Sequence, residues 1–259
     1  MIYFKYLRMV IRSFMQYRLS FWLNLLGQFF VTFFAFAGMA LLFRRFGSIG
    51  GWSFGEAALC FAVVGTSFAL TECFARGFDI FQRQIKSGDF DRLLLRPRGT
   101  VLQVMGSNFE LTRAGRLAQS LVVLGLAVSW VDVTWTAAKI LTLVLMILSG
   151  VAVFTGVFIL GAVVCFWTVE GLEFINIFTD GGREIAAYPL TIYPKWIMRF
   201  FTFLLPFGCF NYLPLLYLTG RAAAHPTLYM LTPLLGFVYL LPCLLLWRFG
   251  VRHYISTGN

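Results

Sequence analysis

The residues most able to do chemistry form an acidic series in the second half of the chain. They recur at spacings of three and four and so share one face of a helix: Glu170, Glu173, Asn176, Asp180 and Glu184. Ionisable groups in an apolar helix are costly and normally face a bundle interior or an aqueous cavity. One interpretation is a polar wall of a translocation path or subunit interface. The other is that the two glutamates lie at the cytoplasmic membrane surface and Asp180 and Glu184 at the opposite one.

A second candidate is the charged segment 84–97. Ser87 or Asp89 can cap a short helix there, Gly88 permits the turn before it, and Pro97 ends it. The helix is predicted to present an apolar face with a charged rim: Phe90, Leu93 and Leu94, with Asp91, Arg92 and Arg96 beside them. Such a face can fill a groove on a partner while the charges fix its register. The residues leave equally open a membrane-surface helix that merely connects two spans.

A third candidate is an aromatic region interrupted by proline between residues 188 and 218. Its distinctive residues are Tyr188, Pro189, Tyr193, Pro194, Pro206, Asn211, Tyr212 and Pro214. Proline removes backbone donors and forces breaks, so the region is predicted to form a bent hairpin near one membrane face. We favour an interfacial aromatic belt as its role. A structural plug or gate is the alternative.

Sequence signatures of ATP binding and of metalloprotease or dinucleotide chemistry are absent. No GxxxxGK[ST], HExxH or GxGxxG pattern occurs, so no phosphate-binding loop is recognisable. Segment 51–55 has the spacing GxSxG, but it follows a glycine-rich turn and not a strand, which is the context that a catalytic serine of this type needs. The two histidines, His225 and His253, are far apart, and the five cysteines are scattered without a CxxC pair. We therefore expect neither an enzyme nor a metal site, and no cofactor bound by this chain. Directional pumping would need energy from elsewhere.

The composition indicates that these segments are positioned by membrane-spanning helices. Of 259 residues, 59% are hydrophobic and only 12% charged, about half the charged share of an ordinary soluble domain. The net charge of +10 fits basic residues retained at the cytoplasmic face, which makes nucleic-acid binding an unnecessary explanation. The sequence predicts an all-α integral membrane protein.

Apolar runs and charged breaks divide the chain, a single transmembrane domain over residues 1–259, into six segments. These are an interfacial helix (1–18), two spans (19–75), a cytoplasmic loop (76–104), three spans (105–187), a re-entrant hairpin (188–218), and a last span with a tail (228–259). Six spans place both termini on one side. That side is predicted to be cytoplasmic, because about two thirds of the 21 Lys and Arg residues then face the cytoplasm.

The expected spans themselves are residues 19–43, 54–74, a third ending at residue 130, 140–167, 169–187 and 228–247. The start of the third span is blurred by Arg113 and Arg116. The second span is expected to end before Arg76, where the charged loop begins.

The whole chain resembles the ABC-2 superfamily of ABC-transporter membrane subunits, and in particular a bacterial group that occurs with a second permease and an ATPase. Segment 88–97, Gly-Asp-Phe-Asp-Arg-Leu-Leu-Leu-Arg-Pro, is similar to the family's G-x-L-D-x-L-L-x-+-P pattern, with Phe90 where Leu is common. The proline-broken region 188–218 carries the rest of the resemblance.

The resemblance implies a type V exporter-like fold. Segment 87–97 would be a coupling helix in a cleft of the ATPase, and region 188–218 an extracellular-side re-entrant hairpin. The chain would work in the bacterial inner membrane as a dimer, with a sister permease as the expected second copy, on two ATPase subunits. ATP and Mg would bind to that partner.

Two other functions remain open from the residues. One is a proton-coupled secondary carrier that uses Glu170, Glu173 or Asp180. The other is a non-transporting membrane assembly protein whose polar face holds a partner helix. The substrate is not specified by the sequence, although the aromatic, weakly charged interior favours amphiphiles such as drugs, lipids or lipid-linked molecules.

Overall fold

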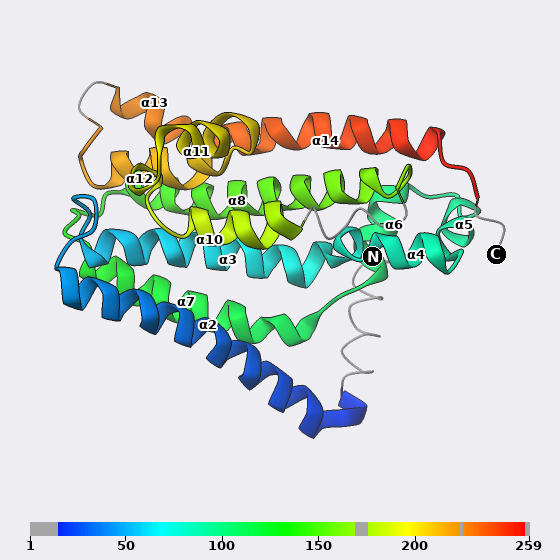
Figure 1. Ribbon diagram of the computed structural model, residues 1–259, viewed down its shortest axis with the longest axis horizontal. Helices are drawn as coiled ribbons and strands as arrows, with labels where there is room; N and C mark the ends of the chain where they lie inside the picture. Colours follow the sequence, from blue (N-terminus) through cyan, green and yellow to red (C-terminus); the bar gives the residue numbers. More distant parts are fainter. Residues whose placement is uncertain (1–14, 169–175, 223–224, 257–259) are drawn as a thin grey trace.

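The structure, a computed structural model, describes residues 15–168, 176–222 and 225–256. In this part of the chain the regular structure is helical, apart from one isolated bridge between Ile49 and Trp52. The long helices lie side by side along one axis, and short helices cover the two ends (Figure 1). The predicted all-α membrane fold is confirmed.

The first half of the described chain contains three long helices and a cluster of short ones. These are η1 (Met15–Tyr17), α2 (Arg18–Phe46), α3 (Phe54–Asp79), α4 (Phe81–Lys86), α5 (Asp89–Leu94), α6 (Thr100–Ser107), η2 (Leu111–Arg113) and α7 (Ala114–Trp130). The second half contains α8 (Ala137–Val164), η3 (Ile177–Gly181), α10 (Gly182–Ala186), η4 (Leu190–Ile192), α11 (Lys195–Arg199), η5 (Phe200–Leu204), η6 (Gly208–Tyr212), α12 (Leu213–Leu218), α13 (Pro226–Leu231) and α14 (Leu234–Arg252).

Within the described residues, five helices are long and apolar enough to cross a membrane, and a sixth span results if one bent pair is counted. The five are α2, α3 with α4, η2 with α7, α8 and α14. The bent pair is Lys195–Leu204 with Gly208–Leu218, which turns by 91°. This bend lies within the predicted re-entrant hairpin. The predicted fifth span, 169–187, falls partly outside the described residues, and its described remainder is short.

Helix α3 is the centre of the bundle. Most of its apolar stretch is buried, whereas α2 is largely exposed along one side. The start of α3 is fixed by a capping box, in which the Ser53 hydroxyl accepts from the Glu56 N–H and the Glu56 carboxylate accepts from the Ser53 N–H. α3 packs against α7 and α8, and α8 packs against α14.

Small residues let these helices approach closely. A Cβ at Gly65 of α3 would lie 2.6 Å from the Ser120 hydroxyl of α7, and one at Gly115 of α7 would lie 2.0 Å from the Leu25 carbonyl of α2. The Ser67 hydroxyl donates to the Ile147 carbonyl of α8 at 3.0 Å. Close backbone approach and interhelical hydrogen bonds are the usual means of helix association in a membrane.

Several predicted boundaries differ from the structure. α3 continues to Asp79 and, after a one-residue break, into α4, so the helix passes the expected end of the second span. The segment expected to be one last span from residue 228 is divided into α13 and α14. The first difference arises because the charges after residue 74 are paired, partly with residues distant in the sequence, as described below. The second has a local cause, since Pro233 interrupts the α13–α14 helix.

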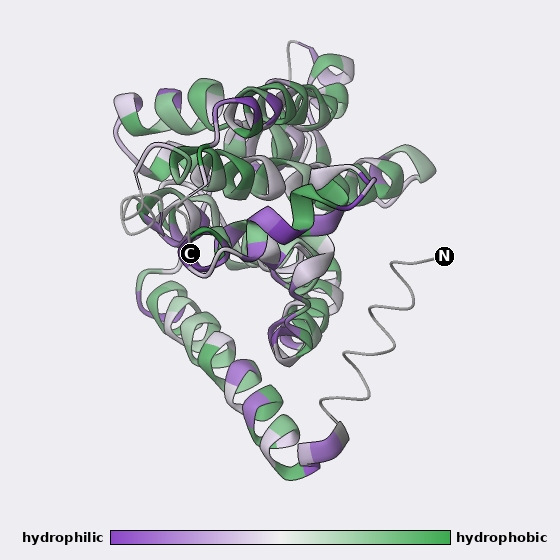
Figure 2. Ribbon diagram, turned by 90° about the vertical axis from the view of Figure 1, so that its right-hand side faces the viewer, coloured by the Kyte–Doolittle hydropathy of each residue, from purple (hydrophilic) through white to green (hydrophobic). Residues whose placement is uncertain are grey.

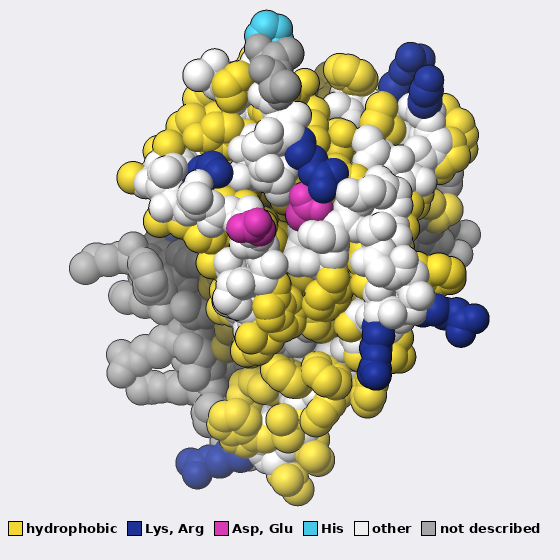
Figure 3. Space-filling view, turned by 90° about the vertical axis from the view of Figure 1, so that its left-hand side faces the viewer, with side chains coloured by type: hydrophobic (Ala, Val, Ile, Leu, Met, Phe, Trp, Pro, Cys, Tyr) yellow, Lys and Arg dark blue, Asp and Glu magenta, His cyan; other side chains and the backbone are white. Residues whose placement is uncertain are grey.

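The two ends of the bundle differ in character. The end formed by α4, α5 and α6 carries a hydrophilic segment in the middle of predominantly hydrophobic helices (Figure 2). The opposite end, formed by α11, α12 and α13, has a small group of acidic and basic side chains surrounded by hydrophobic and uncharged ones (Figure 3). This asymmetry agrees with the predicted placement of the charged loop on one side of the membrane.

Candidate functional site

The short helix predicted between Gly88 and Pro97 forms as α5, and α4 precedes it. Gly88 forms the turn between them with φ +69°, a conformation that favours glycine. Neither predicted side-chain cap is made: the Ser87 hydroxyl instead donates to the Asp89 carboxylate at 2.7 Å. α5 ends at Leu94, three residues before Pro97.

The prediction that Phe90 faces a partner is wrong. Its side chain is fully buried and lies at the centre of an aromatic cluster, here called the aromatic anchor: Phe78, Phe81, Phe90, Phe166, Trp247 and Tyr254. The ring centroids of Phe90 and Phe81 are 4.8 Å apart, and those of Phe90 and Tyr254 are 5.1 Å apart. A six-residue helix has one face against the bundle, and in α5 its only aromatic residue, Phe90, packs there.

The aromatic anchor joins α5 to several spans. Phe78 belongs to α3, Trp247 to α14, and Phe166 follows α8. The Trp247 indole N–H also donates to the Thr100 hydroxyl of α6 at 3.0 Å. The segment after α14 adds a further contact, in which the Ser256 hydroxyl donates to the Asp91 carboxylate at 2.7 Å. The position of α5 is therefore fixed relative to α3, α6 and α14.

The outward side of α5 carries a different set of residues. Leu94 is 39% exposed and Leu95 is 87% exposed, whereas Leu93 is half-buried. Arg92 pairs with Asp89 at 3.4 Å on the surface, and Arg96 is exposed nearby. We call Asp89, Arg92, Leu94, Leu95 and Arg96 the α5 outer surface. Leu95 was missed from the sequence, because it lies just after the helix ends.

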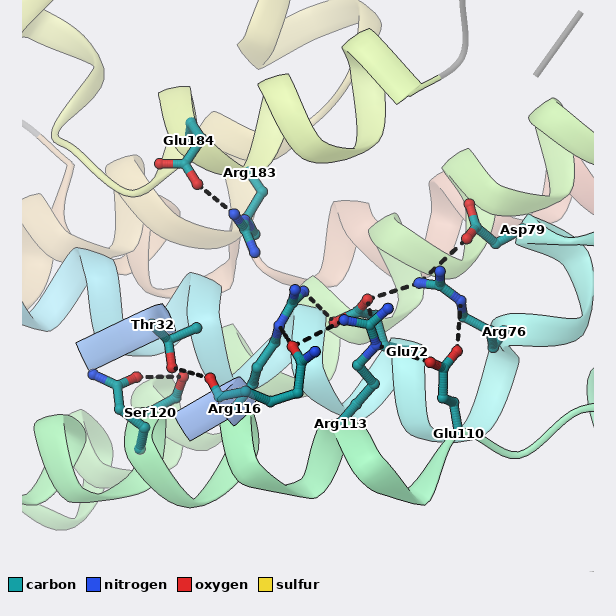
Figure 4. Close-up of polar contacts among 12 residues, drawn as sticks. Thr32, Glu72, Arg76, Asp79, Glu110, Arg113, Arg116, Ser120, Arg183 and Glu184 are labelled. Carbon is teal, nitrogen blue, oxygen red and sulfur yellow. Dashed lines mark hydrogen bonds and ion pairs between the residues drawn. The ribbon is translucent and has the colours of Figure 1, made fainter. Parts of the chain in front are cut away.

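The most extensive polar arrangement was also missed from the sequence. Glu72 of α3 is 2% exposed, and its carboxylate is paired with three guanidinium groups, from Arg76 at 2.7 Å, Arg113 at 3.5 Å and Arg116 at 2.9 Å (Figure 4). This arrangement links α3 to η2 and α7. Arg113 and Arg116, which blurred the expected span, thus have an acidic partner inside the bundle.

Two further carboxylates complete this network. Asp79 lies 3.3 Å from Arg76, and Glu110 lies 3.0 Å from Arg76 and 3.2 Å from Arg113. Three arginines therefore face three carboxylates, which we call the Glu72 network. An approximately neutral network explains how α3 stays helical through a charged segment, since buried charges are tolerated when they are paired and hydrogen-bonded.

The amide of Gln28 connects α2 to the Glu72 network. Its side-chain oxygen accepts from Arg113 at 2.9 Å and from Arg116 at 2.7 Å. These are charge-assisted hydrogen bonds, which are stronger than neutral ones. The network therefore holds three spans together. It lies in the half of the bundle that is predicted to face the cytoplasm.

The predicted acidic series is only partly described. Glu170 and Glu173 lie outside the described residues. Asn176, Asp180 and Glu184 are exposed, and the first two border a polar pocket beside α3 that also contains Arg76 and Asp79. The segment Ile177–Gly181 is a π-helix, which has more residues per turn than an α-helix and so changes the expected three-and-four spacing.

Arg183 is the member of this region that points into the bundle. It pairs with Glu184, and its guanidinium lies 5.1 Å from the ring centroid of Phe68 on α3. Figure 4 shows Arg183 reaching from α10 toward Arg116. The cation–π contact connects α10 to the central helix.

The proline-broken region is held to the rest of the bundle by specific polar contacts. The buried Asn211 amide donates to the Ala186 carbonyl at 2.8 Å, and the Trp52 indole N–H donates to the Thr191 hydroxyl at 2.8 Å. Trp52 also contacts Tyr212, edge to face, at 6.1 Å. Arg221, 4.3 Å from the Trp52 ring, pairs with Glu56 at 2.8 Å.

The predicted hairpin residues divide between buried and exposed positions. Pro189, Pro206 and Pro214 are buried, whereas Pro194 is exposed. Tyr188 and Tyr193 are half-buried. The region therefore has a packed inner side and an aromatic border. Whether it serves as an interfacial aromatic belt or as a plug stays a prediction.

Comparison with known proteins decides the family. A family model described as ABC-2 family transporter protein matches residues 28–258, which include α5, the Glu72 network and the bent hairpin. The chain belongs to the ABC-2 transporter family. No curated protein and no solved structure matches it.

Membership confirms the resemblance inferred from the sequence. This ABC-2 protein is a multi-pass α-helical membrane protein and a permease subunit of an ABC transporter. The transmembrane subunit of this family is not itself the catalytic component. Within the described residues, no group of three or more His, Cys, Asp and Glu side chains could hold a metal ion, and the five cysteines are buried and free.

Proposed function

We propose that this permease is an exporter subunit driven by a separate ATPase, which binds the α5 outer surface. ATP and Mg bind to that partner, and closure of its dimer moves α5. The permease works as a dimer, with a sister permease as the second copy, on two ATPase subunits. It lies in the bacterial inner membrane with both termini in the cytoplasm.

The observation that carries this proposal is the division of α5 into two sides. Phe90 attaches α5 to the spans through the aromatic anchor, while Leu95 is 87% exposed beside Leu94 and a charged rim. An apolar residue at the centre of a charged surface is typical of a protein-binding site. A rigid attachment behind it allows a partner's movement to reach the spans, rather than merely displacing a loop.

The first experiment tests docking with Leu95→Asp. We expect this variant to reach the membrane with an unchanged melting temperature, because the side chain is exposed, but to lose binding of the co-expressed ATPase. Burying an unpaired carboxylate at a hot spot costs about 2 kcal/mol or more, which corresponds to at least about thirtyfold in affinity. The measurement is co-purification of the ATPase together with its activity in lipid nanodiscs.

Leu102→Asp is the matched control, because Leu102 is 66% exposed on the neighbouring helix α6. It should retain ATPase binding. Full binding and normal ATPase stimulation by Leu95→Asp would contradict docking at α5. Transport that survives ATP depletion and vanadate but stops with an ionophore would instead indicate a proton-coupled carrier.

A further inference from the structure

A narrow pocket lies between four helices near the middle of the membrane-spanning region. Its walls come from α2, α3, α7 and α10, and its lining includes Thr32, Phe61, Phe68, Gln119 and Arg183. Thr32 is halfway along α2, which places the pocket at mid-depth. The pocket is distinct from the α5 outer surface and borders the Glu72 network only through Arg116.

Gln119 is the feature of this pocket that requires an explanation. Its side chain is 1% exposed, and among the described residues its amide nitrogen has no hydrogen-bond partner. A buried donor left unsatisfied costs about 1–3 kcal/mol. Such a group in a folded protein therefore points to an acceptor that occupies the site.

The other polar groups in the lining are mainly donors as well. The guanidinium groups of Arg116 and Arg183 border the same space, together with one carboxylate, that of Glu184. The Ser120 hydroxyl also lines it and donates to the Gln119 side-chain oxygen at 3.5 Å. Arg116 also pairs with Glu72, whereas Arg183 pairs with Glu184, whose side chain is 57% exposed. An anionic group in the pocket would accept from the Gln119 amide and from the Arg183 guanidinium, whose own partner Glu184 is largely exposed to solvent.

The remaining walls are apolar. Phe61, Val64, Phe68, Ala35 and Ala69 line the same pocket from α2 and α3. A pocket with donors on one side and apolar side chains on the other matches a ligand with a polar head and a hydrocarbon part. The cation–π contact between Arg183 and Phe68 lies where these two sides meet.

We propose that this pocket binds the acidic head group of a single-chain amphiphile, with Gln119 and Arg183 as its hydrogen-bond donors. The identification of this ligand as the exported substrate rests on the proposed function, whereas binding itself does not. The same donors suit a free carboxylate or phosphate ion, so the test separates the amphiphile from the ion.

The test measures binding to the purified full chain in phosphatidylcholine nanodiscs by calorimetry, with empty nanodiscs as background. The probes are dodecanoate, 1-dodecanol, which lacks the charge, and acetate, which lacks the chain. We expect saturable binding of dodecanoate, with dodecanol and acetate at least tenfold weaker. Gln119→Leu and Arg183→Gln should each weaken dodecanoate binding about 10- to 100-fold.

Gln103→Leu is the matched control, because Gln103 of α6 also has an unpaired side-chain oxygen but lies outside the pocket. It should bind dodecanoate as the unaltered protein does. Without ligand, Gln119→Leu should melt at the same or a higher temperature, since removing an unsatisfied donor relieves its cost. This readout separates loss of binding from loss of folding.

Absence of saturable dodecanoate binding, or equal binding by Gln119→Leu, would overturn the proposal and leave an ordered water as the occupant. Equal affinity for acetate would indicate a site for a free ion, and equal affinity for dodecanol would remove the role of charge; either result also overturns it. Because no ATPase is present in this assay, its failure is distinguishable from failure of docking at α5.

Discussion

The sharpest prediction concerns Glu72→Gln, which removes one negative charge while keeping the side-chain shape. In the folded protein this carboxylate faces Arg76, Arg113 and Arg116 at distances between 2.7 and 3.5 Å. Those arginine side chains are only 15–19% exposed, so water replaces little of the lost interaction. Breaking a buried pair by removing one partner costs about 3–5 kcal/mol.

The assay is thermal unfolding of the purified protein in nanodiscs. At roughly 2–4 °C per kcal/mol for a chain of this size, the melting temperature should fall by about 10 °C. Arg92→Gln is the control, because Arg92 is 80% exposed and its pair with Asp89 at 3.4 Å contributes less than about 1 kcal/mol. It should melt within about 2 °C of the unaltered protein.

A charge-balanced variant sharpens the test. Glu72→Gln combined with Arg116→Gln leaves two arginines facing Asp79 and Glu110, so the double variant should be destabilised less than the sum of the single ones. The expected coupling is about 1–3 kcal/mol. Melting of Glu72→Gln at the temperature of Arg92→Gln, or strict additivity in the double variant, would refute the view that charge balance stabilises this network.

Two further substitutions test the packing that holds α5 in place. Phe90→Ala should destabilise the protein by about 3–5 kcal/mol and, unlike a variant of the α5 outer surface, should lose ATPase binding together with folding. Its control is Phe203→Ala, at an 82% exposed position, which should change the melting temperature little. Gly77→Ala would place a Cβ 1.8 Å from the Val104 carbonyl of α6 and should destabilise by about 3 kcal/mol, whereas Gly125→Ala has open space and should be neutral or slightly stabilising. Both pairs are measured by thermal unfolding, and equal behaviour within either pair would contradict the packing described.

The elements that could be predicted from the sequence are those whose residues determine the structure locally, within one continuous segment. The long apolar runs predict α2, α3 and α8, because a span needs about 20 apolar residues whatever its neighbours are. Gly88 and Pro97 likewise predict a short helix between them, through local turn and stop preferences. The bend in the hairpin follows from prolines for the same reason.

What escaped prediction depends on partners distant in the sequence. The continuation of α3 past Arg76 requires Glu110 and Arg113, which lie more than thirty residues further along the chain. The orientation of α5 depends on Trp247 and Tyr254 from the far end of the chain. No local pattern distinguishes a phenylalanine that binds a partner from one that packs against the chain's own last helix. The sequence did contain one local signal for the Glu72 network. Glu72 and Arg76 are spaced i,i+4 within an apolar helix, which predicts an ion pair inside the bundle.

Helix α3 connects the three arrangements described above. Phe78 packs in the aromatic anchor, Glu72 forms the centre of the network, and Phe68 lines the mid-membrane pocket, all on one continuous helix. In the proposed mechanism, a movement of α5 would pass along α3, because no loop interrupts this helix between Phe68 and Phe78.

The partners of α3 are held to it by contacts of different strength. α7 is held to α3 by Glu72 and by the close approach of Gly65 to Ser120. α10 contacts the pocket side of α3 through Arg183 over Phe68, a cation–π contact worth about 0.5–2 kcal/mol. Arg183 and the unsatisfied Gln119 donor line the same pocket, so this contact and the proposed ligand site share one arginine.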